Sequence, residues 1–118
     1  RDLHSFPTRR SSDLLVVSYN VSNSGSGGGI YWAYHNNVNR DNITNCLVAN
    51  NTASGAAGIY CNYGARIVNS TIVRNNNTSA SNTAAGVYSY NECSILNSII
   101  WGNRDNSGEA NLSGSYNC

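Results

Sequence analysis

The chain has 118 residues, is 40% apolar and only 11% charged, and carries a formal net charge of +1. An ordinary globular domain is roughly 25% charged. The sequence contains no lysine, and asparagine is abundant with 21 copies, all after residue 14. A neutral, lysine-free surface argues against nucleic-acid and anionic-membrane partners, since both require clustered positive charge. No apolar run approaches the roughly 18 residues of a membrane-spanning helix.

The first fourteen residues, RDLHSFPTRRSSDL, resemble the translation of a common short-read sequencing adapter, with every codon accounted for. The alternative is a genuine basic N-terminal arm. Removing residues 1–14 leaves four arginines against four acids, so residues 15–118 sum to zero charge. We therefore interpret residues 1–14 as non-native and residues 15–118 as a fragment of a longer repeat array.

Two sequence anchors recur along residues 15–118. The first is Gly-[Ile/Val]-Tyr, at 29–31, 58–60 and 86–88. The second is Asn-[Cys/Ser]-x-[Val/Ile]-x-x-Asn, at 45–51, 69–75 and 97–103. Positions 56–75 and 84–103 share 9 of 20 residues without a gap. A repeat period between 20 and 50 residues is typical of solenoids and other stacked arrays.

Each repeat predicts two or three short strands separated by bends, because its apolar runs are short, β-branched and bounded by Asn, Gly and Ser. Ile67 and Ile72 lie five apart, so both face inward only if the chain bends between them, near Asn69. No segment keeps a helical period, and asparagine and glycine are poor helix formers. The predicted fold class is all-β.

Equivalent strands in consecutive repeats are expected to pair in parallel and in register, which stacks like residues on one another. Asparagine side chains at equivalent positions then hydrogen-bond from coil to coil. Tyr31, Tyr60 and Tyr88 are likewise expected to form a packed column. The predicted asparagine ladder consists of Asn45, Asn51, Asn69, Asn75, Asn97 and Asn103.

The segments GGGIY…ITNCLVANN, AAGIY…IVNSTIVRNN and AAGVY…ILNSIIWGN resemble right-handed parallel β-helix repeats of the pectin-lyase-like kind. The resemblance covers about residues 15–118. It implies a right-handed solenoid of about three to four coils, without caps, from a large bacterial secreted or cell-surface protein. Leucine-rich and calcium-binding nonapeptide repeats fit less well, because the chain is leucine-poor and no Asp follows Gly25–Gly29.

The sequence offers no complete set of catalytic residues. Glycoside hydrolases require paired carboxylates, and calcium-dependent lyases require an acid cluster with a basic residue. The acids after residue 14 occupy non-equivalent positions, which are Asp41, Glu92, Asp105 and Glu109. We therefore expect no catalytic residues, cofactor or metal within this fragment.

The four cysteines, Cys46, Cys61, Cys93 and Cys118, lack Cys-x-x-Cys spacing, which disfavours a zinc or redox site. Cys46 aligns with serines in later repeats, Cys61 with Ser89, and Cys93 with Ala65. In repeat register, Cys61 and Cys93 lie one coil and four positions apart, which predicts a separation too long for a disulfide. Reduced, buried cysteines acting as small apolar fillers are expected instead.

The segment YWAYHNNVNRDN interrupts the repeat and is the candidate ligand-contact loop. Aromatic faces stack on sugar rings, and polar side chains bond sugar hydroxyls. The alternative is a lengthened bend whose aromatic residues cover the coil edge. The candidate residues are Trp32, Tyr34, His35, Arg40 and Asp41.

The leading functional hypothesis is a non-catalytic segment of an extracellular or cell-surface protein, serving as a stalk, an adhesin or a carbohydrate-contact surface. Its expected partners are a polysaccharide or cell-surface glycan and the neighbouring coils of the parent protein. The alternative is a fragment of a polysaccharide lyase or glycoside hydrolase whose catalytic coils lie outside this chain.

Overall fold

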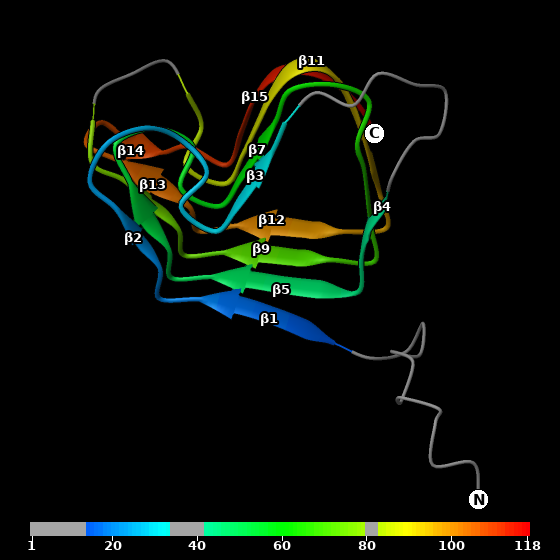
Figure 1. The fold of residues 1–118 in the computed structure, drawn as a ribbon, viewed down its shortest axis with the longest axis horizontal. Coiled ribbons are helices and arrows are strands. Elements are labelled where there is room, and N and C mark those ends of the chain that lie inside the picture. The colour runs from blue at the N-terminus through cyan, green and yellow to red at the C-terminus, as the bar shows by residue number, and fades with distance from the viewer. Residues whose placement is uncertain (1–13, 34–41, 80–82) are drawn as a thin grey trace, which may run out of the picture.

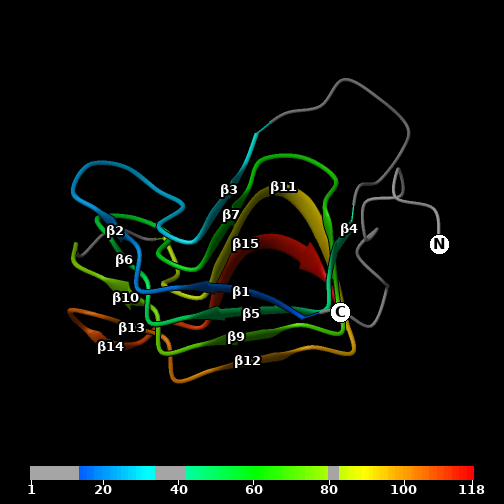
Figure 2. The same cartoon turned by 60° about the horizontal axis from the view of Figure 1, so that its bottom comes forward.

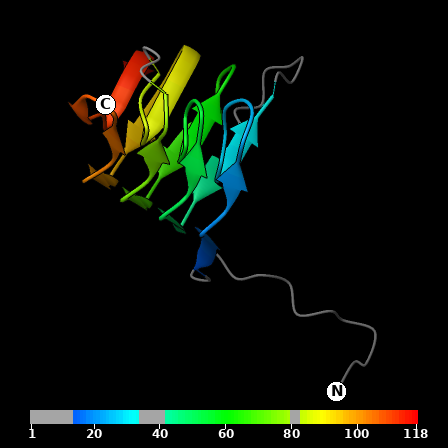
Figure 3. The same ribbon diagram turned by 90° about the vertical axis from the view of Figure 1, so that its left-hand side faces the viewer.

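The computed structural model describes residues 14–33, 42–79 and 83–118, and these ranges form strands and turns without a helix. The strands stack as a parallel β-solenoid of about three turns. Each coil crosses three sheets, which form the sides of the solenoid seen nearly end-on in Figure 1. Figure 3 shows the coils arranged side by side along the axis, in chain order. The predicted all-β parallel solenoid is confirmed, and the first two coils each contain four short strands because sheet C contributes two strands to each of these coils.

The first sheet, sheet A, contains four parallel strands whose residues alternate between the inside and the outside of the solenoid. Its strands lie one after another in Figure 2. The inward column consists of Val17, Val48, Ile72 and Ile100. The strands of sheet A, in spatial order, are β1 (Leu15–Ser18), β5 (Cys46–Ala49), β9 (Thr71–Val73) and β12 (Ile99–Trp101).

The second sheet, sheet B, consists of two-residue strands, parallel except for the last pair. Its strands, in spatial order, are β2 (Val21–Ser22), β6 (Thr52–Ala53), β10 (Asn76–Asn77), β13 (Arg104–Asp105) and β14 (Gly108–Glu109). β14 folds back antiparallel on β13, so the fourth coil is shorter than the others.

The third sheet, sheet C, is folded by a bend in the middle of its longest strand, β11. The first part of β11 pairs with β7, and the second part pairs with β8 (Figure 1). The bend in the preceding coil lies between β7 and β8, where Gly64 has a φ of 59°. The strands of sheet C are β3 (Ile30–Trp32), β4 (Asn42–Thr44), β7 (Ile59–Cys61), β8 (Arg66–Val68), β11 (Val87–Leu96) and β15 (Leu112–Asn117).

Left-handed residues turn the chain at the corners of each coil. Asn69 has a φ of 50° between β8 and β9, and Asn45 and Asn97 are equivalent to it. Asparagine tolerates this region better than most residues because its short polar side chain can bond locally. Ile67 and Ile72, on either side of this corner, are both fully buried. The predicted bend at Asn69 is confirmed.

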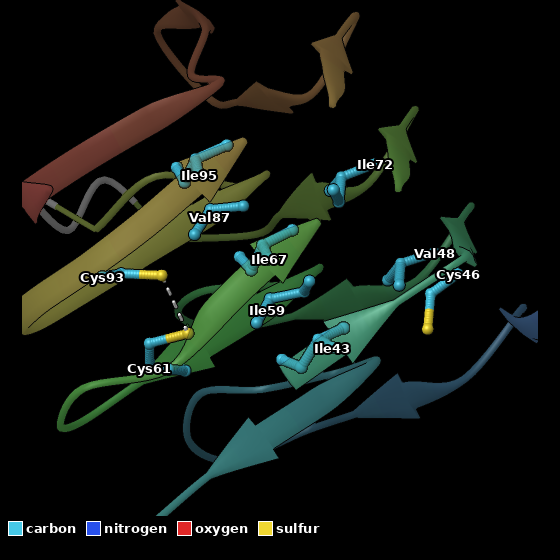
Figure 4. Close-up of a cluster of buried hydrophobic side chains, with 11 residues drawn as sticks. Ile43, Cys46, Val48, Ile59, Cys61, Ile67, Ile72, Val87, Cys93 and Ile95 are labelled. Atoms are coloured by element: carbon cyan, nitrogen blue, oxygen red, sulfur yellow. Dashed lines mark hydrogen bonds between the residues drawn. The ribbon is translucent and has the colours of Figure 1, made fainter. Parts of the chain in front are cut away.

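The core is a set of axial columns of β-branched side chains, several of them shown in Figure 4. One column on β4, β8 and β11 stacks three isoleucines, Ile43, Ile67 and Ile95. Each repeat therefore contributes the same apolar residues to the same column, and burial of these columns is the main force that holds the coils together.

The glycine of the Gly-[Ile/Val]-Tyr anchor is required by close packing across the coil. A Cβ atom at Gly58 would meet the carbonyl oxygen of Gly86 and would lie 3.0 Å from Nδ2 of Asn75. A Cβ atom at Gly86 would lie 2.8 Å from Nδ2 of Asn103. The two sequence anchors are therefore the two sides of one contact.

Candidate functional site

A column of buried asparagine side chains joins the coils at the corner between sheets A and B. Asn51, Asn75 and Asn103 are at most 1% exposed. Nδ2 of Asn51 donates to Oδ1 of Asn75 at 2.9 Å, and Nδ2 of Asn75 donates to Oδ1 of Asn103 at 2.8 Å. Each Oδ1 also accepts the backbone N–H of the asparagine in the preceding coil, at 3.0 Å in both cases. Buried polar groups must be hydrogen-bonded, and the column meets this requirement from within.

Each amide of the column also bonds back to the preceding coil. The second hydrogen of Asn75 Nδ2 is donated to the carbonyl oxygen of Val48 at 3.1 Å, and that of Asn103 to the carbonyl oxygen of Ile72 at 2.9 Å. The amide of each buried asparagine therefore forms hydrogen bonds to the coil before it and to the coil after it. We refer to Asn51, Asn75 and Asn103 as the inner ladder.

Two further asparagines extend the inner ladder at its ends. Asn20 donates through Nδ2 to Oδ1 of Asn51 at 2.9 Å. At the other end, Oδ1 of Asn111 accepts Nδ2 and the backbone N–H of Asn103, both at 3.0 Å. Asn111 lies in register one residue before Leu112, where the earlier coils have glycine. Sequence reasoning missed Asn111 because it lies only eight residues after Asn103, outside the repeat spacing.

The asparagines at the other corner, Asn45, Asn69 and Asn97, have a different environment. They have positive φ angles and are exposed or half-exposed. One side-chain bond joins this set, from Nδ2 of Asn97 to Oδ1 of Asn69 at 2.6 Å. Their shared property is the backbone conformation. We refer to them as the corner asparagines.

The tyrosine column lies on sheet C. The rings of Tyr31 and Tyr60 are stacked, with centroids 4.8 Å apart and planes inclined by 7°. Tyr60 and Tyr88 are 5.4 Å apart and tilted by 35°. Burial raises the pKa of the Tyr60 hydroxyl above its usual value. Since neighbouring rings pack on one another, the predicted tyrosine column is confirmed.

Two of the described acids, Asp105 and Glu109, accept hydrogen bonds from residues two or three positions away. Oδ1 of Asp105 accepts the backbone N–H groups of Ser107 at 2.7 Å and Gly108 at 3.0 Å, and these bonds lower the pKa of the Asp105 carboxyl. Oε1 of Glu109 accepts Nδ2 of Asn111 at 3.0 Å. Residues 14–33, 42–79 and 83–118 contain no group of three or more His, Cys, Asp or Glu side chains suited to a metal ion.

An open hollow of about 400 Å³ lies at the corner between sheets A and B, in the later coils. Its lining residues are Arg74, Trp101, Gly102, Arg104 and Glu109. Trp101 is 62% exposed, at a position that Val73 occupies in the preceding coil. Arg104 and Glu109 lie opposite each other on β13 and β14. The hollow therefore combines an exposed indole with two guanidinium groups and a carboxylate. We refer to it as the Trp101 hollow.

The Trp101 hollow is not among the sites predicted from the sequence. Its signal was available, because Trp101 is the largest residue at an outward position that is otherwise Ser18, Ala49 or Val73. The arginines come from different coils, and only the register brings them together.

Of the predicted ligand-contact loop, residues 31–33 and 42 are described. The side chain of Trp32 is half-buried and packs against the core. Tyr34, His35, Arg40 and Asp41 lie outside the described residues.

The cysteines form no disulfide, and three of the four are buried, whereas Cys118 is exposed. The Cys46 thiol donates to the carbonyl oxygen of Thr44 at 3.3 Å, as the Ser70 hydroxyl donates to that of Val68 at 2.9 Å. A thiol and a hydroxyl therefore make the same bond at this position, which accepts Cys in one repeat and Ser in another.

Cys61 and Cys93 are free and buried, as expected. Their separation differs from the expectation, because repeat register alone predicts that these residues lie too far apart for a disulfide, yet their sulfur atoms are 3.7 Å apart. The bend between β7 and β8 instead brings these two positions together inside the coil.

Comparison with known proteins finds no protein-family model, curated protein or solved structure that matches this chain. No helix in the described ranges is long and apolar enough to cross a membrane.

Proposed function

We propose that this chain is a non-catalytic segment of a large extracellular or cell-surface protein with a right-handed, pectin-lyase-like β-helix. In this proposal its solenoid forms a stiff stalk, and the Trp101 hollow contacts a polysaccharide or cell-surface glycan. The observation that carries the proposal is the exposed indole of Trp101 beside Arg74 and Arg104.

The chemistry of the Trp101 hollow suits a sugar. An indole presents an apolar face to the C–H groups of a pyranose ring and is common in recognition sites. Guanidinium groups donate several hydrogen bonds in a fixed geometry, to hydroxyls or to the carboxylates of uronic acids. The shallow, open form of the hollow suits a unit within a long chain rather than an enclosed small molecule.

The outer face of sheet A extends this contact surface. Its strands β1, β5, β9 and β12 contain no charged residue. Ile99 is 60% exposed on this face and lies two residues from Trp101. Exposed apolar surface beside a polar rim is typical of a contact site.

The described acids support a non-catalytic segment. Asp105 and Glu109 have their carboxylates committed to neighbouring N–H groups. Glu92 is exposed at the bend of β11, in a different sheet from Asp105. A hydrolase requires two carboxylates facing one glycosidic bond. These positions do not provide that arrangement.

The proposal is tested by affinity electrophoresis of the purified protein in gels containing a neutral glucan or a polyuronate. Retardation by at least one polysaccharide is expected, and Trp101→Ala should weaken it about tenfold, equivalent to about 1.4 kcal/mol. Tyr90→Ala is the matched control, because Tyr90 is 59% exposed on sheet C and away from the hollow. The glycan contact would be contradicted if neither polymer retarded the protein, or if the wild type and Trp101→Ala were retarded equally.

A further inference from the structure

Cys61 and Cys93 bring two buried thiols into contact across adjacent coils. Both side chains are 0% exposed, and their sulfur atoms are 3.7 Å apart. Figure 4 shows the two side chains pointing toward each other from β7 and β11. The contact joins residues that are 32 apart in the sequence.

The bend of sheet C creates this contact. Cys61 is the last residue of β7 and pairs in register with Ser89 of β11. Cys93 lies four residues beyond Ser89, after a register shift in β11. Both coils bend here, one between β7 and β8 and the other in the middle of β11. The inward side chains on either side of the bend therefore lie close together.

The neighbouring coils show that neither cysteine is needed for packing alone. Ser89 occupies the position of Cys61 in the next coil, and Ala65 occupies the position of Cys93 in the coil before. Between the coils of β7 and β11, a cysteine at the first position contacts a cysteine at the second position. The same chain therefore supplies conservative replacements for both residues.

We propose that Cys61 and Cys93 are an oxidation site that forms a disulfide between adjacent coils. A disulfide requires sulfur atoms about 2.05 Å apart, so the two atoms must approach by about 1.7 Å. The bend between the two strands is the place where the chain can adjust, because Tyr63 and Gly64 are exposed there.

The oxidant is a low-molecular-weight disulfide. When the exposed bend opens locally, the thiolate of Cys93 attacks one sulfur of the oxidant, which forms a mixed disulfide and releases one small thiolate. The thiolate of Cys61 then attacks the Cys93 sulfur, which forms the protein disulfide and releases the second small thiolate. The two protons of the protein thiols pass to the two released thiolates, so the protein loses two electrons and the oxidant gains them.

The electrostatics of the pair are consistent with this order. The hydrogen bond with Cys93, together with burial, raises the pKa of the Cys61 thiol. The same hydrogen bond lowers the pKa of the Cys93 thiol. Cys93 is therefore the first of the two to be deprotonated and to attack.

The disulfide would connect β7 and β11 and close a loop of about 30 residues in the unfolded chain. Export to an oxidising compartment would permit it, since disulfides persist in secreted and surface proteins. The inference does not depend on the glycan contact, because it concerns a different sheet and a different readout.

The test uses the full chain with Cys118→Ser, which removes the exposed thiol and prevents links between molecules. The protein is incubated with oxidised glutathione, and remaining thiols are counted by alkylation under denaturing conditions. Three thiols are expected to fall to one, and peptide mapping should show Cys61 joined to Cys93. The oxidised protein should melt on the order of 10 °C higher than the reduced protein.

Two variants keep the test decisive. Cys61→Ser and Cys93→Ala copy the residues of the neighbouring coils, so both should fold, with melting under reducing conditions close to that of the parent. Neither should form the intramolecular link or gain stability on oxidation. Three thiols persisting in the parent, or a disulfide that joins Cys46 instead of linking Cys61 to Cys93, would overturn the proposal.

Discussion

The inner ladder and the corner asparagines contain the same residue at the same repeat spacing, yet their structural roles differ. Asn75 of the inner ladder is buried and holds the coils on both of its sides through its amide group. Asn69 of the corner set is exposed and has a left-handed backbone, with a single side-chain bond to Asn97. Asparagine is thus repeated for its amide at one corner and for its tolerance of positive φ at the other.

This difference shows that regular recurrence of a residue does not reveal which of its properties is used. The buried amides carry the larger share of stability, because removing them leaves polar groups without partners in the core. The corner positions require only a backbone conformation, which glycine also supplies.

The largest expected effect comes from Asn75→Ala. This change removes the acceptor of the Asn51 backbone N–H and the donors to Asn103 and Val48. We expect the free energy of unfolding to fall on the order of 4 kcal/mol, measured by urea denaturation. A loss below about 1 kcal/mol would show that the amide column does not hold the coils together.

Gly58→Ala should have the next largest effect. The added methyl group would press on the carbonyl oxygen of Gly86, and the inner ladder amide of Asn75 lies 3.0 Å from it. A destabilisation of about 3 kcal/mol is expected in the same urea experiment, since well-packed interiors resist added atoms.

The control for Gly58→Ala is Gly102→Asn. Gly102 has a φ of 65° and open space around it, and the equivalent positions in earlier coils are Asn50 and Arg74. We expect a change within about 0.5 kcal/mol. Equal losses of stability for the two variants would indicate that both positions require glycine for its backbone freedom, rather than for the space that it leaves beside the inner ladder.

The corner asparagines should respond weakly. Asn69→Ala is expected to cost about 1 kcal/mol, because alanine resists the left-handed conformation of this residue. Asn69→Gly should change stability by less than about 0.5 kcal/mol, since glycine adopts that conformation freely. A loss in Asn69→Gly as large as that of Asn75→Ala would remove the distinction between the two sets.

The smallest expected effect concerns the exposed turn at Asp105. Bonds from Ser107 and Gly108 lower the pKa of its carboxyl from the ordinary value of 3.8. Because the pKa is lower in the folded state, the stabilisation is present above pH 3.8 and is lost as the pH falls through the folded pKa.

Asp105→Asn should remove this acid-sensitive contribution. The melting temperatures of wild type and Asp105→Asn, compared across the acid range, are expected to converge as the pH falls. A constant difference between the two proteins at every pH would contradict the assignment.

The sequence was sufficient to predict the parallel solenoid, the bend at Asn69 and the tyrosine column, because each depends on residues that recur at a fixed spacing. Stacking in register converts such a spacing directly into contact. Tyr31 and Tyr60 illustrate this, since their rings meet although they are 29 residues apart.

Features that depend on how sharply the chain bends could not be predicted. The contact of Cys61 with Cys93 requires the angle of the bend in sheet C, which repeat spacing does not contain. The role of Asn111 requires the fold-back of β14 on β13. The Trp101 hollow differs from these features, because it depends on the register that brings Arg74 and Arg104 together, and the repeat spacing already contains that register.

The inner ladder also has a direction. Every side-chain amide, from Asn20 through Asn103, donates to the asparagine that follows it, so the amide dipoles add along the axis as peptide dipoles do in a helix. The donor end of the column lies at Asn111, whose Nδ2 donates to the carboxylate of Glu109, much as an acidic side chain caps a helix N-terminus. The inner ladder therefore has an acceptor end and a donor end. A further coil can extend it head to tail but not head to head.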